Sequence, residues 1–596
     1  MCSIKKHSNK MAQRLRTTQQ IAMERYGITP KEVESVEITK NPFNITRQRM
    51  AGAFQVLKTR GEHIDPAFEE RVMSMDVAAE RRFMVEGVGE VTGMRCQHLQ
   101  IEGLVSKGGI RFEPELTPDK DRALAFSQTP KNLMAGLPYV GSKGGANINP
   151  GEMEEHQVRA VCHTWVNTFM DMIGPNIDVP AGDWGVGSRE VNWMLEQYRD
   201  NLMAIARVAV NGGEVTLGTY RAMGPDMIEH DYELRYDQRK ALEYFRRNVG
   251  LADGHVSPNS EILRRISEDA DFAMLFARPA FTGKTVEMGG HPIRTGATGR
   301  GMFIQAMEAA KYLYREGRWR VAEGIKLSEE QERLLDIYVR MNLGEQVTRE
   351  ERRELAGKQE EMGKIERALF QNATLVVTGA GKVGLGVIEH FENLGCGVKL
   401  LAISDSRGAT KNLEGGINVA EITQLKNAGG KVAQYPGGEA TTQEDIMGIP
   451  CTIFASTTPE FAYIDQSTAP LIKAQLHLQG TNGPNTPAGD AILRANGVFD
   501  MDDIMNNAGG VTASGLEWAR NLYAVAEYIN PTLQRNIGTL GLKLRRGQVT
   551  DDSMYQALDT LMVKDFWQTL QTAIRYNTDL GTANRINTIH YLQSVM

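Results

Sequence analysis

The sequence predicts an α/β fold with at least two domains. The chain has 596 residues, and a single hydrophobic core rarely grows past about 250–300 residues. Residues from about 373 to 515 alternate short apolar runs with helical stretches, which is typical of a parallel α/β unit. Residues from about 80 to 215 carry motifs rich in glycine, lysine and aspartate. We therefore expect one segment of chemical interest in each half of the chain.

The composition is that of a globular protein. The formal net charge is -7 and the hydrophobic fraction is 41%. No apolar run approaches the ~20 residues of a membrane span, and no basic stripe with interleaved aromatic residues is present. We therefore expect neither a membrane nor a nucleic acid as partner. The five cysteines are scattered and form no CxxC pair, which favours a reducing, cytoplasmic compartment and argues against a disulfide framework or a metal site.

The N-terminal stretch has no acidic residue before Glu24. Such a composition is compatible with an organelle-targeting segment. Nothing in the stretch resembles a cleavage site, so we favour a basic first helix of the folded protein.

A glycine-rich motif opens the later segment. In NATLVVTGAGKVGLGVIEHFENLG, an apolar, β-branched run precedes Gly379, Gly381 and Gly384, and a helical pattern follows. Glycines at this GxGxxG spacing allow a tight turn, the approach of a pyrophosphate and close packing of helix on strand. The helix N-terminus offers free N–H groups to phosphates. The motif in this context indicates a Rossmann-like, doubly wound unit that binds a dinucleotide, with a tight turn and no nucleotide as the lesser alternative.

The next predicted strand, GVKLLAISDS, ends at Asp405, which lies 21 residues beyond Gly384. An acidic residue at this distance is placed to bind the ribose hydroxyls. Asp405 would repel a 2′-phosphate and favour NAD, whereas Arg407 would pair with one and favour NADP. The choice between NAD and NADP therefore stays open.

Three lysines lie among glycines in the earlier segment: Lys107 in SKGGIRF, and Lys131 and Lys143 in PKNLMAGLPYVGSKGGANINP. The glycines are expected to let a ligand approach the backbone. Three ammonium groups with no interleaved carboxylate attract an anion, and burial lowers a lysine pKa into a useful range for acid–base chemistry. In IGPNIDVPAGDWGVGSRE, we expect Asp183 to neutralise one lysine and exchange protons with an amine, and Asp178 to form a turn.

A helical hairpin is predicted near 328–370. Ser328 with Gln331, and Thr348 with Glu351, have the spacing of capping boxes, in which two side chains satisfy backbone donors at a helix start. We interpret the hairpin as an insertion without chemical function.

At this level of detail the chain resembles the glutamate/leucine/phenylalanine/valine dehydrogenase family, and within it the hexameric glutamate dehydrogenases. The resemblance spans both predicted segments, and the motifs occur in the family's order. The matching stretches are KGGIRF (107–112), TPKNLMAGLPYVGSKGG (129–145), IGPNIDVPAGDWGVGSRE (173–190), RTGATGRG (294–301), VVTGAGKVG (376–384), AISDSRGA (402–409), GTNGPNTP (480–487) and NNAGGVTASGLEWARN (506–521).

The resemblance implies a role for each charged residue. Lys107, helped by Ser514, would hold the side-chain carboxylate of the substrate, and Lys131 its α-carboxylate. Lys143 would polarise the carbonyl and activate water, and Asp183 would carry protons to and from the nitrogen.

The implied reaction is the reversible, NAD- or NADP-dependent oxidative deamination of glutamate to 2-oxoglutarate and ammonia. Thr298 and Asn482 match residues near the nicotinamide. The resemblance also implies a homo-oligomer, expected to be a hexamer.

The resemblance further implies two domains around a cleft. The first, a substrate and oligomerisation domain, would span 1–215 and be completed by C-terminal helices 515–596. A charged helical insertion would cover 216–284. The nucleotide-binding domain would span 285–514 and contain the helical hairpin near 328–370.

Two alternatives carry different expectations. A dehydrogenase of an apolar amino acid would lack a lysine at Lys107, because a buried, unpaired ammonium opposes an apolar side chain; Lys107 together with Ser514 favours glutamate. A non-catalytic scaffold or regulator would have lost at least one of Lys131, Lys143 and Asp183, and all three are present.

Overall fold

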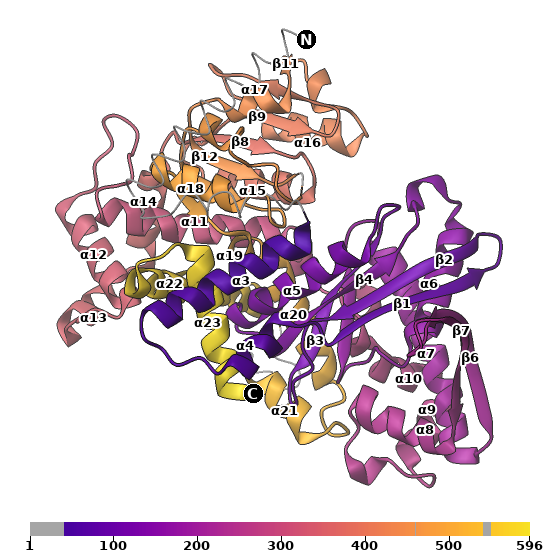
Figure 1. Ribbon diagram of the computed structural model, residues 1–596. Coiled ribbons are helices and arrows are strands. Elements are labelled where there is room, and N and C mark those ends of the chain that lie inside the picture. The colour runs from indigo at the N-terminus through magenta and orange to yellow at the C-terminus, as the bar shows by residue number, and fades with distance from the viewer. Residues whose placement is uncertain (1–40, 459, 540–549) are drawn as a thin grey trace.

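The protein has two lobes, each built on a seven-stranded sheet (Figure 1). The computed structural model describes residues 41–458, 460–539 and 550–596. The basic first helix expected for the N-terminal stretch up to Glu24 lies outside the described residues. The lobe that contains β1 to β7 is called the first lobe, and the lobe that contains β8 to β14 the second lobe.

The first sheet has the order β5-β3-β4-β2-β1-β6-β7. Strands β5, β3 and β4 run parallel, and the other neighbours pair antiparallel. The mixed sheet confirms the predicted α/β character of this part of the chain. Its strands are β1 Val77–Val85, β2 Gly89–Gln97, β3 Val105–Phe112, β4 Tyr139–Ala146, β5 Asp178–Gly182, β6 Glu214–Met223 and β7 Glu229–Asp237.

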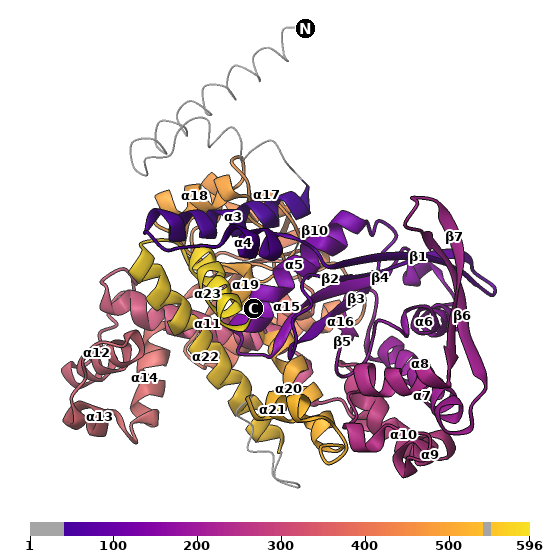
Figure 2. The same ribbon diagram turned by 60° about the horizontal axis from the view of Figure 1, so that its bottom comes forward.

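The prediction of a helical insertion over 216–284 is wrong for its first part. Strands β6 and β7 form an antiparallel hairpin there and continue the first sheet through the pairing of Arg82 with Arg221. The hairpin stands at the edge of the first lobe (Figure 2). Three helices follow and bury apolar residues in the same core as the sheet: α8 Gln238–Tyr244, α9 Glu261–Glu268 and α10 Ala270–Ala277.

Helices cover both faces of the first sheet. The core under α6 and α7 contains Trp165 and Phe169, while the core under α3 and α5 contains Phe126 and Val140. Val140 and its neighbour Tyr139 enter different cores, because successive side chains of a strand point to opposite faces. The helices are α3 Pro42–Thr59, α4 Pro66–Met73, α5 Pro118–Met134, α6 Glu155–Phe169 and α7 Ser188–Asn211.

The second sheet has the order β11-β10-β9-β8-β12-β13-β14. The five strands from β9 to β14 in this order are parallel, as expected of a doubly wound unit. The strand order reverses between β8 and β12, which is the place where such folds bind ligands. The strands are β8 Thr374–Thr378, β9 Lys399–Asp405, β10 Gly408–Lys411, β11 Glu439–Thr441, β12 Cys451–Ser456, β13 Ala474–Gln479 and β14 Phe499–Met501, and the helices among them are α15 Lys382–Asn393, α16 Val419–Asn427, α17 Gln443–Met447, α18 Pro487–Ala495 and α19 Asp503–Asn506.

Both predicted capping boxes are present. The side chains of Ser328 and Thr348 accept hydrogen bonds from the backbone N–H of Gln331 and Glu351. The side-chain oxygens of Gln331 and Glu351 in turn accept from the backbone N–H of Ser328 and Thr348. The segment forms three helices instead of a two-helix hairpin, and it packs with α11 in the core of the second lobe. The three helices are α12 Glu329–Leu343, α13 Arg349–Leu355 and α14 Gln359–Leu369, and α11 spans Ala297–Arg315.

The C-terminal helices connect the two lobes. Helix α22 buries Met554 and Leu558 in the core of the first lobe and Phe566 and Leu570 in the core of the second. Among the described residues, no helix is long and apolar enough to cross a membrane. The helices are α20 Gly509–Tyr523, α21 Pro531–Thr539, α22 Asp551–Tyr576 and α23 Leu580–Val595.

Glycines let α11 and α15 cross at close range, and the space around Gly299 is much tighter than the space around Gly386. A Cβ added to Gly299 would lie 2.6 Å from backbone atoms of Gly386 and Val387. A Cβ added to Gly386 would have its nearest neighbour 3.7 Å away, at Gly296. The contact on Gly299 is with backbone, which no side-chain rotation can relieve.

We predict opposite effects of alanine at the two positions. Gly299→Ala should lower the stability by about 1–3 kcal/mol, the usual cost of overpacking. Gly386→Ala should be neutral or stabilising, because alanine favours a helix by about 1 kcal/mol over glycine. Thermal unfolding of both variants measures the difference, and equal melting temperatures would contradict this account of the crossing.

Candidate active site

Three separate elements carry the three lysines. Lys107 lies in β3 and Lys143 in β4, neighbouring parallel strands, while Lys131 lies in helix α5, which packs on β4. All three are buried. The fold thus brings together residues that the sequence separates by up to 36 positions.

Two glycines beside the lysines allow neighbouring strands to approach closely. A Cβ on Gly108 would lie 1.5 Å from the carbonyl oxygen of Ser142, and one on Gly145 would lie 1.8 Å from that of Arg111. The expectation that a ligand approaches these glycines is therefore wrong, because protein backbone occupies the space. Gly109 has a different neighbour: an added Cβ would lie 2.7 Å from the Cβ of Asp183, so this glycine makes room for the aspartate.

Asp183 contacts Lys143 directly. The Nζ of Lys143 donates a hydrogen bond to Oδ2 of Asp183, and Arg111 lies 3.5 Å from the same oxygen. Burial by itself would raise the pKa of Asp183, but the positive charges of Lys143 and Arg111 outweigh burial and hold this pKa well below its usual value. The carboxylate therefore stays ionised beside the lysine.

Lys107 ends in a small hydroxyl cluster. Its Nζ donates to Oγ1 of Thr282 at 2.6 Å, and Thr282 shares a hydrogen bond of 2.6 Å with Oγ of Ser514. Ser514 thus lies beside Lys107 as expected, with Thr282 between them. Lys107 is 1% exposed, and burial lowers its pKa well below the usual value.

Lys131 reaches the second lobe. Its Nζ donates to Oδ1 of Asn482 at 2.9 Å, and the amide of Asn482 donates to Oε1 of Glu460 at 2.6 Å. Glu460 in turn binds Arg111 of the first lobe, with distances of 2.7 and 3.1 Å to the two guanidinium nitrogens. Burial lowers the pKa of Lys131. A continuous chain of polar contacts therefore joins the two lobes at the lysines.

Sequence reasoning missed three residues of this site: Arg111, Thr282 and Glu460. Arg111 stands in KGGIRF, and its alternation with Lys107 along β3 was a usable signal. Thr282 and Glu460 carry no local motif, and only the tertiary fold brings them to the site.

Contrary to the prediction from the sequence, the side chain of Asp178 does not stabilise a turn. It begins β5, and its carboxylate binds Arg95 with both side chains fully buried. Gln97 and Ser142 also donate to it, at 2.9 and 2.8 Å. This satisfied ion pair ties β2, β4 and β5 together beneath the site.

The three glycines of the nucleotide motif fit a pyrophosphate. Gly379 has φ +104, a conformation that favours glycine, and a Cβ on Gly384 would lie 1.9 Å from the carbonyl oxygen of Gly379. A Cβ on Gly381 would meet nothing within 4 Å, so open space lies above this residue. Gly381 is the N-cap of α15 and has no side-chain cap, which leaves the first N–H groups of the helix to a phosphate.

Asp405 ends β9 as predicted, but its carboxylate is already engaged. It accepts hydrogen bonds from the backbone N–H of Arg407 at 2.8 Å and from that of Val432 at 3.1 Å, and Nζ of Lys426 lies 2.6 Å away. The guanidinium of Arg407 donates to the carbonyl of Gly430 at 3.2 Å. No signal in the sequence pointed to Lys426, because it lies in α16, 21 residues beyond Asp405.

Thr298 lies at the start of α11, where the two lobes approach each other. A Cβ added to Gly510 of α20 would lie 2.7 Å from its hydroxyl oxygen. In the described part of the chain, no group of three histidine, cysteine or acidic side chains is arranged to hold a metal ion.

Two domain families match the chain. Residues 70–200 match the dimerisation domain of the Glu/Leu/Phe/Val dehydrogenases, and residues 358–540 match the Glutamate/Leucine/Phenylalanine/Valine dehydrogenase domain. The chain belongs to the glutamate/leucine/phenylalanine/valine dehydrogenase family.

Relatives within the family are similar over most of their length. The glutamate dehydrogenase of Thermotoga maritima is 26% identical over 84% of both chains. The NAD-specific glutamate dehydrogenase of Peptoniphilus asaccharolyticus is 25% identical over 77% of this chain and 81% of its own, and the NADP-specific enzyme of Saccharolobus shibatae is 24% identical over 72% and 71%. The hetero-hexameric glutamate dehydrogenase of Thermus thermophilus has a TM-score of 0.62, with 17% identity over 94% of this chain and 97% of that one, and so shares the fold.

A further buried carboxylate lies near the family's lysine site. Asp121, in the first turns of α5, is 0% exposed, and neither of its oxygens has a hydrogen-bond partner. Burial raises its pKa to about 7, although the charge of Lys143 opposes the shift. The folded protein therefore binds this proton more tightly than the unfolded chain.

We predict that Asp121→Asn stabilises the protein more at pH 8 than at pH 5. The wild type keeps the contribution of the protonated carboxyl at low pH and loses it as the pH rises from about 4 to about 7, by up to roughly 4 kcal/mol. Asparagine does not titrate. Melting temperatures of both proteins measured across this range test the point, and parallel pH dependences would show that Asp121 does not carry the effect.

Proposed function

We propose that the protein is an NAD(P)-dependent glutamate dehydrogenase, which catalyses the reversible oxidative deamination of L-glutamate to 2-oxoglutarate and ammonia. The observation that carries the proposal is the environment of Lys107. The names of the relatives, which are glutamate dehydrogenases, agree with it.

Lys107 is a buried cation that lacks an anionic partner. Within the described residues, no carboxylate lies at ion-pairing distance from its Nζ, and the hydroxyl of Thr282 is its hydrogen-bond acceptor. Burying an unpaired charge is costly. A substrate carboxylate at this position would supply the missing charge, and the hydroxyls of Thr282 and Ser514 would complete its hydrogen bonds. This pocket therefore favours a dicarboxylic amino acid over an apolar one.

The remaining cations divide the other tasks. Lys131 would bind the α-carboxylate, exchanging its contact with Asn482 for one with the substrate. Lys143 would polarise the carbonyl and activate the water that attacks the iminium, while Asp183, held ionised beside it, would accept and return the proton of the nitrogen. When bound, the nicotinamide supplies the hydride transfer, and the protein supplies orientation and charge.

The cofactor would lie across Gly379, Gly381 and Gly384, with Thr298 and Asn482 on the nicotinamide side. Both NAD and NADP remain candidates. Lys426 neutralises Asp405, so the repulsion that this carboxylate would exert on a 2′-phosphate is reduced. Relatives specific for each cofactor are known by name. Initial rates with glutamate and 2-oxoglutarate, each with both cofactors, test the activity and the preference together.

We further infer a cytoplasmic homo-oligomer, expected to be a hexamer. The scattered cysteines support a reducing compartment. The hetero-hexameric neighbour supports an assembly of six chains, and sedimentation or light scattering measures the number.

We predict that Lys107→Leu separates glutamate from apolar substrates. Losing one partner of a buried charge pair costs about 3 kcal/mol or more, so glutamate turnover should fall at least about a hundredfold. Turnover of norvaline or methionine should fall much less or rise, because their side chains need no counter-charge. Steady-state rates on the three amino acids measure the ratio, and an equal loss on all of them would make Lys107 a structural residue.

A further inference from the structure

A second cation from the first lobe reaches the loop that Lys131 touches. Arg49, on helix α3, donates from Nη2 to the carbonyl oxygen of Asn485 at 2.7 Å and to Oδ2 of Asp490 at 2.9 Å. Asn485 lies three residues beyond Asn482 in the segment 480–487, which runs from the end of β13 to the first residue of α18 and is called the loop 480–487. The first lobe therefore holds this loop of the second lobe at two points.

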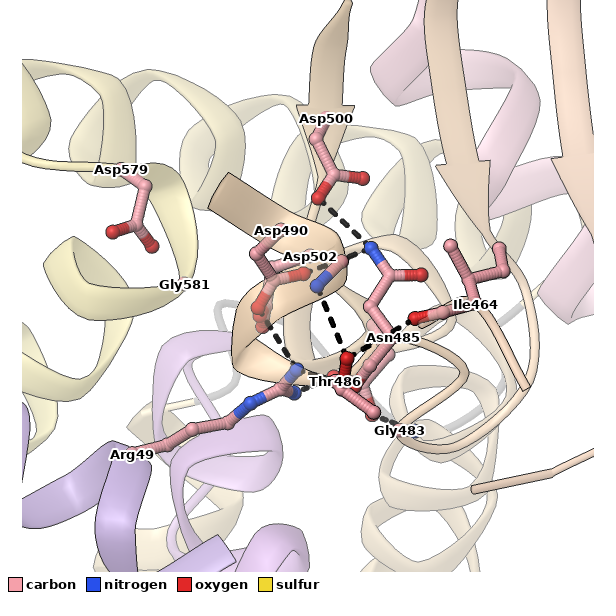
Figure 3. Close-up of polar contacts among 12 residues, drawn as sticks. Arg49, Ile464, Gly483, Asn485, Thr486, Asp490, Asp500, Asp502, Asp579 and Gly581 are labelled. Atoms are coloured by element: carbon pink, nitrogen blue, oxygen red, sulfur yellow. Dashed lines mark hydrogen bonds and ion pairs between the residues drawn. The ribbon is translucent and has the colours of Figure 1, made fainter. Parts of the chain in front are cut away.

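The Arg49 side chain enters an acidic pocket of the second lobe. Figure 3 shows Arg49 extending from its helix toward Asp490, with Asn485, Asp500 and Asp502 around it. Arg49 is 10% exposed at its side chain and also lies 3.9 Å from Asp503. The aspartates come from α18, β14 and α19, so the pocket is formed by the secondary structure that follows the loop.

The aspartates of this pocket also accept hydrogen bonds from the loop. The amide of Asn485 donates to Asp490 at 2.8 Å and to Asp500 at 3.1 Å, and the backbone N–H of Gly483 donates to Asp503 at 2.9 Å. The loop is thus held both by Arg49 and by these carboxylates, and Asp490 contacts both Arg49 and the loop.

The other arginines near this pocket contact other aspartates. Arg494 binds Asp579 at 2.6 Å, and Arg585 lies 3.5 Å from Asp502. Among the described residues, Arg49 alone forms an ion pair with Asp490 or Asp503. Burial raises the pKa of Asp490 to about 6, although the charges of Arg49 and Arg494 oppose the shift.

Helix α3 is fixed to the helix that carries Lys131. Phe54 and Leu57 of α3 share a buried cluster with Phe126 and Leu133 of α5. Arg49 and Lys131 therefore belong to one packed unit, and the spacing of their contacts on the loop is set by the first lobe.

We propose that Arg49 is a positioning residue: it anchors the loop 480–487 on the first lobe and so fixes Asn482 beside Lys131 for cofactor and substrate. The effect on turnover rests on the proposed dehydrogenase function. The effect on the loop does not, because it concerns contacts within the ligand-free chain, and the effect on cofactor binding requires only the nucleotide site.

The test compares Arg49→Gln with Arg81→Gln. Arg81 is a matched control, because its side chain is also 10% exposed and it binds both an aspartate, Asp171 at 2.7 Å, and a carbonyl oxygen, that of Thr168. It lies in β1 of the first sheet and touches no residue of the loop. Both variants should melt at lower temperature than the wild type, since each loses a buried ion pair.

Only Arg49→Gln should loosen the loop. Hydrogen–deuterium exchange of the ligand-free protein should become faster at 480–487 in this variant and stay unchanged there in Arg81→Gln. Because a misplacement of about 1 Å near the reacting groups costs up to about a hundredfold, kcat for glutamate should fall about tenfold to a hundredfold. Fluorescence titration with NADH and NADPH should show weaker binding. Arg49→Lys, which keeps the positive charge on a shorter side chain without the planar guanidinium, should give values between those of the wild type and Arg49→Gln.

A double variant separates positioning from stability. Arg49→Gln leaves Asp490 unpaired, so Arg49→Gln with Asp490→Asn should melt closer to the wild type while the carbonyl of Asn485 still lacks its donor. Turnover, cofactor affinity and loop exchange should then remain impaired.

Recovery of turnover together with the melting temperature would overturn the proposal, as would unchanged exchange at 480–487 in Arg49→Gln. A wild type without glutamate activity would refute the proposed function, and the exchange and cofactor titrations would still decide the role of Arg49.

Discussion

A cation removed from water must find a negative partner, and this requirement shapes the junction of the two lobes. The first lobe buries Lys107, Lys131, Lys143 and Arg111 on neighbouring elements. Lys143 and Arg111 pair with carboxylates. Lys131 donates to the amide oxygen of Asn482 and Lys107 to the hydroxyl of Thr282, so each of these two lysines has a neutral partner. In the proposed function, a dicarboxylic substrate would bring the charge that is missing at Lys107, and specificity would follow from this electrostatic need and not from shape alone.

The same requirement connects the lobes. Glu460 and Asn482 of the second lobe satisfy Arg111 and Lys131 of the first, and the acidic pocket of the second lobe satisfies Arg49. Polar contacts across the junction can be exchanged for contacts with a ligand. The apolar residues of α22 pack in both cores and join the lobes independently of these contacts. In the proposed function, a substrate that binds Lys131 would compete with Asn482, and this competition would couple substrate binding to the cofactor side of the site.

The sequence predicted what depends on local chemistry. The three glycines of the nucleotide motif, the strand end at Asp405 and the capping box at Ser328 each follow from a few neighbouring residues. The lysines and Asp183 were singled out by their glycine-rich stretches, and the family resemblance supplied their roles. The hairpin of β6 and β7 was missed because its half-exposed strands carry many charged residues, which resemble a solvated helix. Glu460 was missed because its role exists only where two distant segments meet, and Asp178 because a turn is the commoner use of an aspartate in such a stretch.

The pair of Lys143 and Asp183 is the centre of the account, and Asp183→Asn tests it most directly. The substitution is nearly isosteric and removes the proton-carrying group while leaving Lys107 and Lys131 to bind the substrate. Single-turnover hydride transfer should fall by about 10²–10⁴-fold, as for the loss of a general acid–base group, while the dissociation constants of the cofactor and of 2-oxoglutarate change little. Near-normal turnover in this variant would contradict the account and leave Asp183 as a residue that only shapes the chain after β5.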